Sequence, residues 1–334
     1  MYIAARRLRN DRGIVVRALY QDEPLLHTAL RRVRDAAART LLRETGTVVL
    51  SAPADEAATC GIIATDATEN VLEQYRIETQ PYYRPTAEEV ALYEAAYAVR
   101  MPMMLKGPTG CGKTRFVEYM AWRLSKPLVT IACHEDMTAS DLVGRHLLDA
   151  QGTRWQDGPL TIAVRFGAIC YLDEIVEARQ DTTVVIHPLT DARRVLPLEK
   201  KGELVHAHPD FQLVISYNPG YQNIMKDLKQ STKQRFGALD FGWPQRAVEV
   251  EIVTHESGVS PDIADRLVSI GERSRNLKGH GLDEGLSTRM LIYAGSLIAQ
   301  GVDPIAAGSV ALVRPVTDDP DIRDALDAAV KTFF

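Results

Sequence analysis

The chain has 334 residues, of which 46% are hydrophobic and 25% are charged, and its formal net charge is −5. These fractions are typical of globular proteins, and the length allows two or three packed units with a substantial core. The acidic balance argues against a nucleic-acid scaffold, which needs a basic field, and no run approaches the roughly 18–20 apolar residues of a membrane span, so we expect neither a nucleic-acid nor a membrane partner.

Residues 1–79 are predicted to form a separate N-terminal extension. Apolar residues recur on one helical face after Pro24, and short β-like runs follow at Thr47–Leu50 and Gly61–Ala64. Two residues that precede prolines, Gln80 and Arg84, mark the boundary, because a residue before proline is pushed out of helical geometry. The extension carries no motif that points to chemistry, so no role is assigned to it.

Residues 80–243 alternate strand and helix patterns, which predicts an α/β domain with a parallel five-stranded sheet and helices on both faces. The expected strands are Met101–Lys106, Leu128–Cys133, Ala168–Leu172, Phe211–Tyr217 and Ala238–Phe241. The expected helices are Pro85–Val99, Lys113–Leu124, Gln180–Leu189 and Ile224–Arg235.

Residues 244–334 contain no strand pattern and are predicted to form a small C-terminal helical domain. Its expected helical stretches are Arg246–Ser257, Asp262–Arg275, Ser287–Ala299 and the tail Asp303–Phe334. The N-terminal residues show no apolar block with a small-residue cleavage site, so we expect no secretory signal, and the cysteines (Cys60, Cys111, Cys133 and Cys170) form no Cys-x-x-Cys pair. We therefore expect reduced thiols in a cytoplasmic protein.

A phosphate-binding loop is the strongest chemical signal in the sequence. The pattern G-x-x-x-x-G-K-[ST] is matched in full by Gly107-Pro108-Thr109-Gly110-Cys111-Gly112-Lys113-Thr114. The loop follows an apolar strand and opens a helix, so its backbone N–H groups and the helix N-terminus can bind phosphate oxygens. Lys113 is expected to reach the β- and γ-phosphates of ATP, and the Thr114 hydroxyl is expected to bind Mg²⁺.

Two acidic residues follow the apolar strand that ends at Leu172. Parallel strands present their carboxyl ends at one edge of a sheet, so Asp173 and Glu174 are expected beside the phosphate loop. Asp173 would hold Mg²⁺, mostly through water, and Glu174 would polarise the attacking water. The alternative, an acidic helix cap after a core strand, is weakened by the complete phosphate loop.

Three further residues are candidates for catalysis, each with an ordinary structural alternative. Asn218 ends an apolar strand and could orient the lytic water, or could simply form a turn before Pro219. Arg235 precedes the last strand and could stabilise phosphoryl charge, or could pair with a helix dipole. Arg289 lies in the helical domain and could equally form a surface salt bridge. Sequence pattern alone does not decide between the catalytic and the structural interpretation of these three residues.

The order of these elements resembles the MoxR branch of AAA+ proteins, and more narrowly the CbbQ/NirQ/NorQ family, over residues 80–334. The matching segments are Gln80–Tyr83, Met104–Val117, Ala139–Arg145, Asp157–Leu160, Tyr171–Glu174, His187–Asp191, Ser216–Asn223 and Leu277–His280. The resemblance implies an AAA+ P-loop NTPase core followed by a helical lid, with ATP and Mg²⁺ as cofactors.

The resemblance also implies roles for the residues left open above. Asn218 matches the first sensor, Arg235 the arginine finger that reaches the neighbouring subunit's ATP site, and Arg289 the second sensor. The segment 195–208 is similar to the hairpin before the first sensor, and 147–159 to the insert in the second core helix. In this family both insertions work at the face or pore of a homo-hexameric ring.

Partners also follow from the resemblance. Family members work with an adaptor that carries a von Willebrand factor A domain and activate another enzyme: CbbQ with CbbO activates Rubisco, and NorQ with NorD activates nitric oxide reductase. The C-terminal segment 310–334 is similar to CbbQ proteins, which favours a CbbO-like adaptor and Rubisco as client. A nitric oxide reductase activator and a nucleotide-switched binding module with little turnover stay open as alternatives, and Glu174 and Asn218 favour hydrolysis over the switch.

Overall fold

The computed structural model describes residues 7–10, 13–16, 49–51, 61–63, 71–149, 152–218, 228–276, 282 and 284–334. The chain divides into two units, Met1–Arg76 and Ile77–Phe334. In the first unit, β1 (Arg7–Asn10) pairs antiparallel with β2 (Gly13–Val16), and β3 (Val49–Ser51) with β4 (Gly61–Ile63). The β3 and β4 strands overlap the predicted β-like runs, and the helix predicted after Pro24 lies outside the described residues.

A parallel sheet forms the centre of the second unit. Its strands are β5 (Met103–Lys106), β6 (Leu128–Ala132), β9 (Ile169–Asp173), β12 (Gln212–Tyr217) and β13 (Gly237–Asp240). They lie in the order β13-β5-β12-β9-β6, and every neighbouring pair is parallel. All residues of the central strand β12 are buried, as expected for a strand covered on both faces. The predicted α/β fold class is confirmed.

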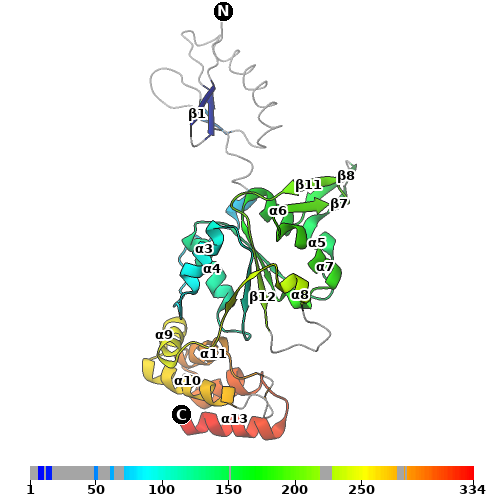
Figure 1. Cartoon of the computed structure of the whole chain (residues 1–334). Helices are drawn as coiled ribbons and strands as arrows, with labels where there is room; N and C mark the ends of the chain where they lie inside the picture. The colour runs from blue at the N-terminus through cyan, green and yellow to red at the C-terminus, as the bar shows by residue number, and fades with distance from the viewer. Residues whose placement is uncertain are drawn as a thin grey trace, which may run out of the picture. The chain divides into compact units, whose positions relative to one another are not determined.

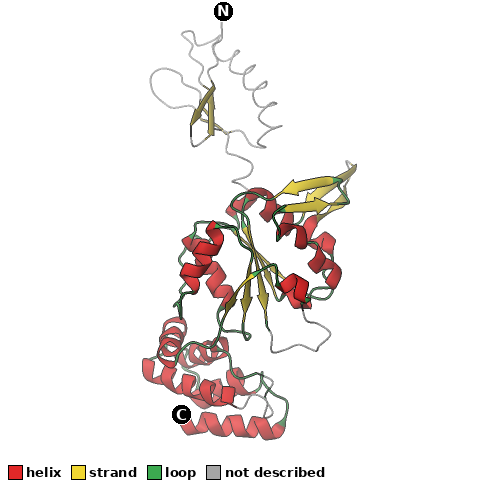
Figure 2. Ribbon diagram, in the orientation of Figure 1, coloured by secondary structure: helices red, strands yellow, loops and turns green. Residues whose placement is uncertain are grey.

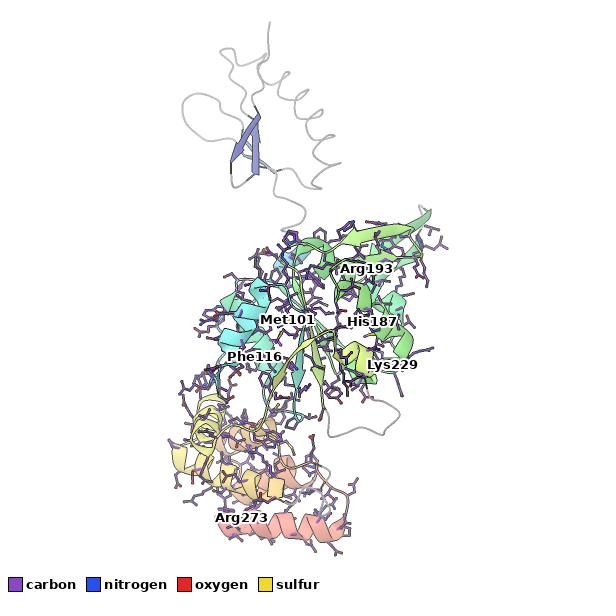
Figure 3. All side chains as sticks on the ribbon, in the orientation of Figure 1. Met101, Phe116, His187, Arg193, Lys229 and Arg273 are labelled. Carbon is purple, nitrogen blue, oxygen red and sulfur yellow. The ribbon has the colours of Figure 1, made fainter. Side chains whose placement is uncertain are left out.

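Helices cover both faces of this sheet (Figure 1, Figure 2). Helices α3 (Glu89–Ala98) and α4 (Lys113–Arg123) lie on one side, and α5 (Ala139–Val143), α6 (Pro159–Phe166) and α7 (Gln180–Val184) lie on the other. On the α4 side, the fully buried Phe116 packs against the rings of Tyr93 and Phe241, at centroid distances of 5.4 and 5.2 Å (Figure 3). Aromatic packing therefore fixes the helix that follows the phosphate loop to the sheet.

Two hairpins extend from the core. Strand β7 (Gly144–Asp149) pairs with β8 (Gly152–Asp157), and β10 (Val195–Leu198) pairs with β11 (Glu203–His206). The hairpins touch where the His146 ring nitrogen Nε2 lies 3.1 Å from the Lys200 carbonyl oxygen. A hydrogen bond of this length holds the two insertions side by side.

Several helices are shorter in the structure than the sequence pattern predicts. The helix predicted over 180–189 ends at Val184 and resumes as a 3₁₀ turn at His187–Leu189, because Pro188 supplies no N–H to continue it. The prediction over 224–235 keeps only α8 (Gln230–Lys233), while residues 219–227 lie outside the described part of the chain. The short helices α5 and α6 were not predicted, since five and eight residues are too few to display a helical periodicity clearly.

The C-terminal helical domain contains α9 (Arg246–Ser257), α10 (Pro261–Asn276), α11 (Thr288–Ala299), α12 (Pro304–Gly308), a π-helical turn (Ser309–Val313) and α13 (Pro320–Phe333). These elements share one apolar core that includes Leu267, Leu291, Leu312 and Val330. The predicted tail helix is thus broken before α13, whose N-terminus is set by Pro320 and by the Asp319 cap. Among the described residues, no helix combines the length and apolar character needed to cross a membrane.

A buried ion pair joins three of these helices. Arg275 on α10 donates to both carboxylate oxygens of Glu249 on α9, at 2.7 and 2.6 Å, and Glu249 is fully buried. The Thr288 hydroxyl at the start of α11 donates to the same carboxylate at 2.6 Å. The Arg275 guanidinium also lies 4.3 Å from the ring centroid of Trp243, in the segment that enters the domain. This network fixes the N-terminus of α11.

We predict that Arg275→Ala lowers the free energy of unfolding by about 3–5 kcal/mol, because it leaves the Glu249 carboxylate buried without its charge partner. Guanidinium unfolding of the nucleotide-free protein, followed by circular dichroism, measures the loss. Arg246→Ala is the matched control, since Arg246 pairs with Asp265 and Glu272 at the surface of the same domain, where such pairs contribute about 0–1 kcal/mol. Equal losses in the two variants would contradict this role of the buried pair.

Candidate functional site

The predicted phosphate loop connects β5 to α4 at the carboxyl edge of the sheet. Gly107 (φ 154°) is required by space, because a Cβ there would lie 2.3 Å from the Phe241 carbonyl oxygen. Gly110 (φ 72°) faces the helical domain, and a Cβ there would lie 2.7 Å from the Ser287 Cβ. Both glycines therefore let the backbone approach other segments too closely for a side chain. The loop thus packs against the last strand on one side and the N-terminus of α11 on the other.

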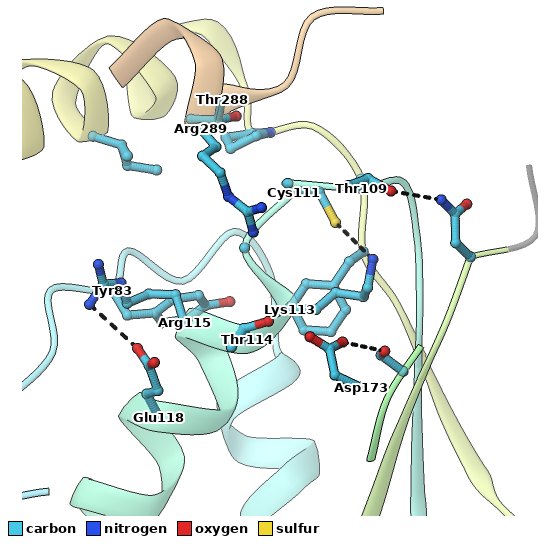
Figure 4. Close-up of a pocket in the computed structure, with 18 of the residues that line it drawn as sticks. Tyr83, Thr109, Cys111, Lys113, Thr114, Arg115, Glu118, Asp173, Thr288 and Arg289 are labelled. Atoms are coloured by element: carbon cyan, nitrogen blue, oxygen red, sulfur yellow. Dashed lines mark hydrogen bonds and ion pairs between the residues drawn. The ribbon is translucent and has the colours of Figure 1, made fainter. Parts of the chain in front are cut away.

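Lys113 is the first residue of α4, and its ammonium group lies inside the loop (Figure 4). The Nζ atom donates to the carbonyl oxygens of Gly107 and Pro108, both at 2.8 Å, and lies 4.0 Å from the Cys111 sulfur. A positive charge thereby sits beside a helix N-terminus and a turn of backbone N–H groups. This combination attracts a polyanion such as a triphosphate.

The two predicted acids lie at the end of β9. Asp173 Oδ1 accepts hydrogen bonds from the Tyr171 hydroxyl at 2.7 Å and from the Ser216 hydroxyl at 2.6 Å. Ser216 Oγ in turn accepts from the Glu174 backbone N–H at 2.7 Å. Glu174 adopts φ 54° and ψ 46°, a left-handed conformation that costs on the order of 1–3 kcal/mol in a non-glycine residue. The Ser216 hydroxyl helps to hold that conformation.

The electrostatic surroundings of Glu174 suit a proton acceptor. Burial raises the pKa of its carboxyl group, and the neighbouring charges of Asp173 and Glu177 raise it further. Lys113 and Arg289 act in the opposite direction. A carboxylate whose pKa lies above its ordinary value is a stronger base than a solvated one, which is the property that water activation needs.

Asn218 lies one residue beyond the end of β12, between the phosphate loop and the helical domain. Its Nδ2 donates to Thr109 Oγ1 at 3.0 Å and to Glu284 Oε1 at 3.2 Å. An amide in this position contacts both walls of the site. This position is compatible with the predicted sensor role. It is also compatible with the structural interpretation, in which Asn218 forms a turn and its amide holds that turn by the same hydrogen bonds.

Arg289 extends from the start of α11 toward the phosphate loop, as Figure 4 shows. The side chain of Ser287 caps α11 by accepting from the Met290 N–H, and Thr288 is tied to Glu249. The residues on either side of the Arg289 Cα are therefore fixed. The helical domain in this way contributes one positive charge to the site.

These groups line one cavity of about 740 Å³. At one end lie the phosphate loop, Asp173, Glu174, Asn218 and Arg289. The remainder of the wall mixes aromatic, aliphatic and charged side chains, among them Tyr82, Tyr83, Phe241, Ile252 and Ile292. A cleft with a charged end, and with aromatic and aliphatic side chains elsewhere in its wall, suits a ligand that has a polyanionic part and a flat ring system.

Arg235 is the predicted site residue that the fold does not bring to this cavity. Its guanidinium lies 3.7 Å from the Asp191 carboxylate, which also pairs with Arg193 at 2.6 Å. Hydrogen bonds from Arg193, and the charge of Arg235, hold the pKa of Asp191 at about 2. Burial and the charge of Arg235 lower the pKa of His187, which Figure 3 labels with Arg193. Arg235 is not among the residues that line its own chain's cavity.

Sequence reasoning missed the hydroxyl groups that hold the acids. Tyr171 precedes Asp173 by two residues on a strand, so both point to the same face, and Ser216 stands in the same relation to Asn218. A polar residue two positions before a functional residue in a buried strand was a usable signal. Glu284 gave none, because its segment has no regular pattern.

Comparison with known proteins matches two families to separate parts of the chain. Residues 102–236 match the family described as AAA domain (dynein-related subfamily), and residues 249–333 match CbbQ/NirQ/NorQ C-terminal. The protein CbbQ of Hydrogenophilus thermoluteolus is 69% identical over 261 residues, which are 78% of this chain and 98% of that protein.

Two further proteins are also similar over nearly their whole length. The denitrification regulatory protein NirQ of Pseudomonas aeruginosa is 57% identical over 75% of this chain and 96% of its own. The protein NorQ of Paracoccus denitrificans is 56% identical over 76% of this chain and 94% of its own. Identity is thus higher with the CbbQ protein than with either of these two.

Proposed function

Because this chain belongs to the CbbQ/NirQ/NorQ family of AAA+ ATPases, we propose that it is an ATP-hydrolysing ring motor that remodels and reactivates inhibited Rubisco. It would do so with an adaptor that carries a von Willebrand factor A domain, similar to CbbO. The observation that carries the hydrolytic part is the meeting of Lys113, Asp173, Glu174, Asn218 and Arg289 around one cavity. The higher identity to CbbQ favours Rubisco as the client.

The cavity fits ATP and Mg²⁺ by the chemistry of its donors. The residues that would hold the phosphates are Gly107, Pro108, Thr109, Gly110, Cys111, Gly112, Lys113 and Thr114. A hard cation prefers oxygen ligands, and Thr114 Oγ1 and the Asp173 carboxylate supply them, directly or through water. When bound, Mg²⁺ would neutralise charge on the phosphate oxygens during transfer.

Each remaining group has a task that its position allows. Glu174 would take the proton of the attacking water, since its raised pKa makes it a better base. Asn218 would orient that water from its place between the loop and the helical domain. Arg289 would bind phosphate oxygens and so report the nucleotide to the lid.

Arg235 would complete the site of a neighbouring subunit. It lies outside its own cavity, and a guanidinium that never loses its proton suits developing phosphoryl charge. A homo-hexamer is the assembly that the resemblance implies. The paired hairpins β7–β8 and β10–β11 would then contact the adaptor or the client, and the exposed Leu148 and Leu204 offer apolar contacts there.

Two other functions remain as alternatives. A NorQ- or NirQ-like activator of nitric oxide reductase would use the same ATPase site with a different client, because family identity is high on both sides. A nucleotide-switched binding module would bind ATP and barely hydrolyse it. The strained and hydrogen-bonded Glu174 argues against the switch, which has no need of a water-activating base.

We predict that the protein, with its cognate adaptor and ATP, restores CO₂ fixation by Rubisco that is blocked by a tightly bound sugar phosphate. Glu174→Gln should bind ATP but hydrolyse it at least about a hundredfold more slowly, because an amide is a poor base, and should restore no activity. Glu94→Gln is the control, since Glu94 pairs with Arg123 outside the cavity.

The outcomes separate the alternatives. Near-normal ATP turnover by Glu174→Gln would contradict the assignment of Glu174 as the general base. If Rubisco activity is not restored and nitric oxide reductase matures in a parallel assay, the result would favour a NorQ-like activator of nitric oxide reductase. Recovery with a non-hydrolysable ATP analogue would favour the switched module.

The pKa of Glu174 also predicts a pH profile for turnover. The base acts when deprotonated. The rate of hydrolysis should therefore be maximal above the raised pKa of Glu174 and should be lost as the pH falls through that pKa. Glu177→Gln removes one of the charges that raise it, so the acid limb of the kcat/KM profile, which reports the free enzyme, should move to lower pH. Glu94→Gln should leave the limb in place. A limb that moves to higher pH, or not at all, in Glu177→Gln would refute this electrostatic account.

A further inference from the structure

We propose that the Tyr171 hydroxyl is a positioning group that orients the Asp173 carboxylate and the Thr114 hydroxyl for Mg²⁺. The inference deepens the proposed ATPase function and rests on it. Tyr171 lies in the middle of β9, is fully buried, and stands in the matched segment Tyr171–Glu174 without an assigned role. Its role would be to act through the two cation-binding side chains rather than to touch the nucleotide.

The hydroxyl group of Tyr171 bridges the two side chains. It donates to Asp173 Oδ1 at 2.7 Å and lies 3.5 Å from Thr114 Oγ1. A phenol has one hydrogen, and Asp173 takes it, so a hydrogen bond between Tyr171 and Thr114 forms only with the threonine as donor and when their 3.5 Å separation shortens. A threonine that donates its hydrogen to Tyr171 turns an oxygen lone pair outward, and a lone pair is what a cation requires.

The hydrogen bonds on Asp173 are asymmetric. Tyr171 and Ser216 both donate to Oδ1, whereas no side chain in the described part of the chain donates to Oδ2. Hydrogen bonds thereby hold the carboxylate through Oδ1. Oδ2 is left to coordinate a cation or to accept a hydrogen bond from the water bound to it. Outer hydrogen bonds that fix a ligand in this manner commonly change metal affinity about 10- to 100-fold.

The hydroxyl would be costly at this position without such a purpose. A phenylalanine would fill the same space in the sheet, whereas a buried hydroxyl must be hydrogen-bonded to offset its lost hydration. Burial also raises the pKa of Tyr171 well above its ordinary value, so the group stays a proton donor at neutral pH. The chain thus keeps a polar atom in its core beside two predicted Mg²⁺ ligands, Asp173 and Thr114, and beside Ser216, which also donates to Asp173.

The test is the Mg²⁺ dependence of nucleotide binding, measured with a fluorescent ATP analogue in EDTA and over a Mg²⁺ titration. Tyr171→Phe should bind the analogue in EDTA as the wild type does, while the Mg²⁺ concentration for half-saturation rises about tenfold. Tyr97→Phe is the matched control, because its hydroxyl donates at 2.9 Å to the Asp210 carbonyl oxygen, away from the cavity. It should leave the Mg²⁺ titration unchanged.

A merely structural hydroxyl would lower the melting temperature in both Tyr→Phe variants and leave the Mg²⁺ titration alone, which would overturn the proposal. A tighter Mg²⁺ titration in Tyr171→Phe would also overturn it, because the phenol would then compete with the cation. If Tyr171→Phe does not fold, Ser216→Ala must raise the half-saturating Mg²⁺ concentration, and an unchanged value contradicts the asymmetric hold on Asp173. Failure of the wild type to bind the analogue at all would instead defeat the ATPase proposal itself.

Discussion

The parallel pairing of β12 with both β5 and β9 determines where the groups that the sheet contributes to the cavity lie. Tyr217 is in register with Lys106, and Ile215 with Leu172, so the three strands end at nearly the same level. The phosphate loop, Asp173, Glu174 and Asn218 are the residues that come next in the chain. In Figure 2 the strands run toward the helical domain, so the helical domain faces this edge of the sheet. A slip of one residue in β9 would turn Tyr171 and Asp173 to the other face of the sheet.

The helical domain adds the part of the site that the sheet does not provide. Its contribution depends on the N-terminus of α11, where Ser287 contacts the phosphate loop closely enough that Gly110 has no room for a side chain. The buried pair of Arg275 and Glu249 fixes that N-terminus through Thr288. A ligand bound to both Arg289 and the loop would thus be linked to the packing of the whole helical domain, which is a physical route from nucleotide to lid position.

The sheet and the phosphate loop were predictable because each has a strong local signal: long apolar runs for β9 and β12, and a complete loop motif before α4. Family resemblance alone indicated the β10–β11 hairpin and an insert at 147–159, the structure shows that insert region as the β7–β8 hairpin, and the short α5 and α6 were missed. That Ser216 lies beside Asp173 depends on the register between β9 and β12, which are far apart in sequence, and local pattern does not contain it. That Arg235 lies outside its own cavity likewise depends on tertiary placement.

The central claim is that one chain holds an incomplete ATPase site, which a neighbour's Arg235 completes. Turnover in mixtures of Arg235→Ala and Glu174→Gln subunits tests it most directly. Each variant alone should be nearly inactive. A mixture in equal amounts should regain about a quarter of wild-type turnover, because an Arg235→Ala subunit keeps its own Glu174 and can receive Arg235 from a Glu174→Gln neighbour. A mixture no more active than its separate components, or a fully active Arg235→Ala protein, would contradict the claim.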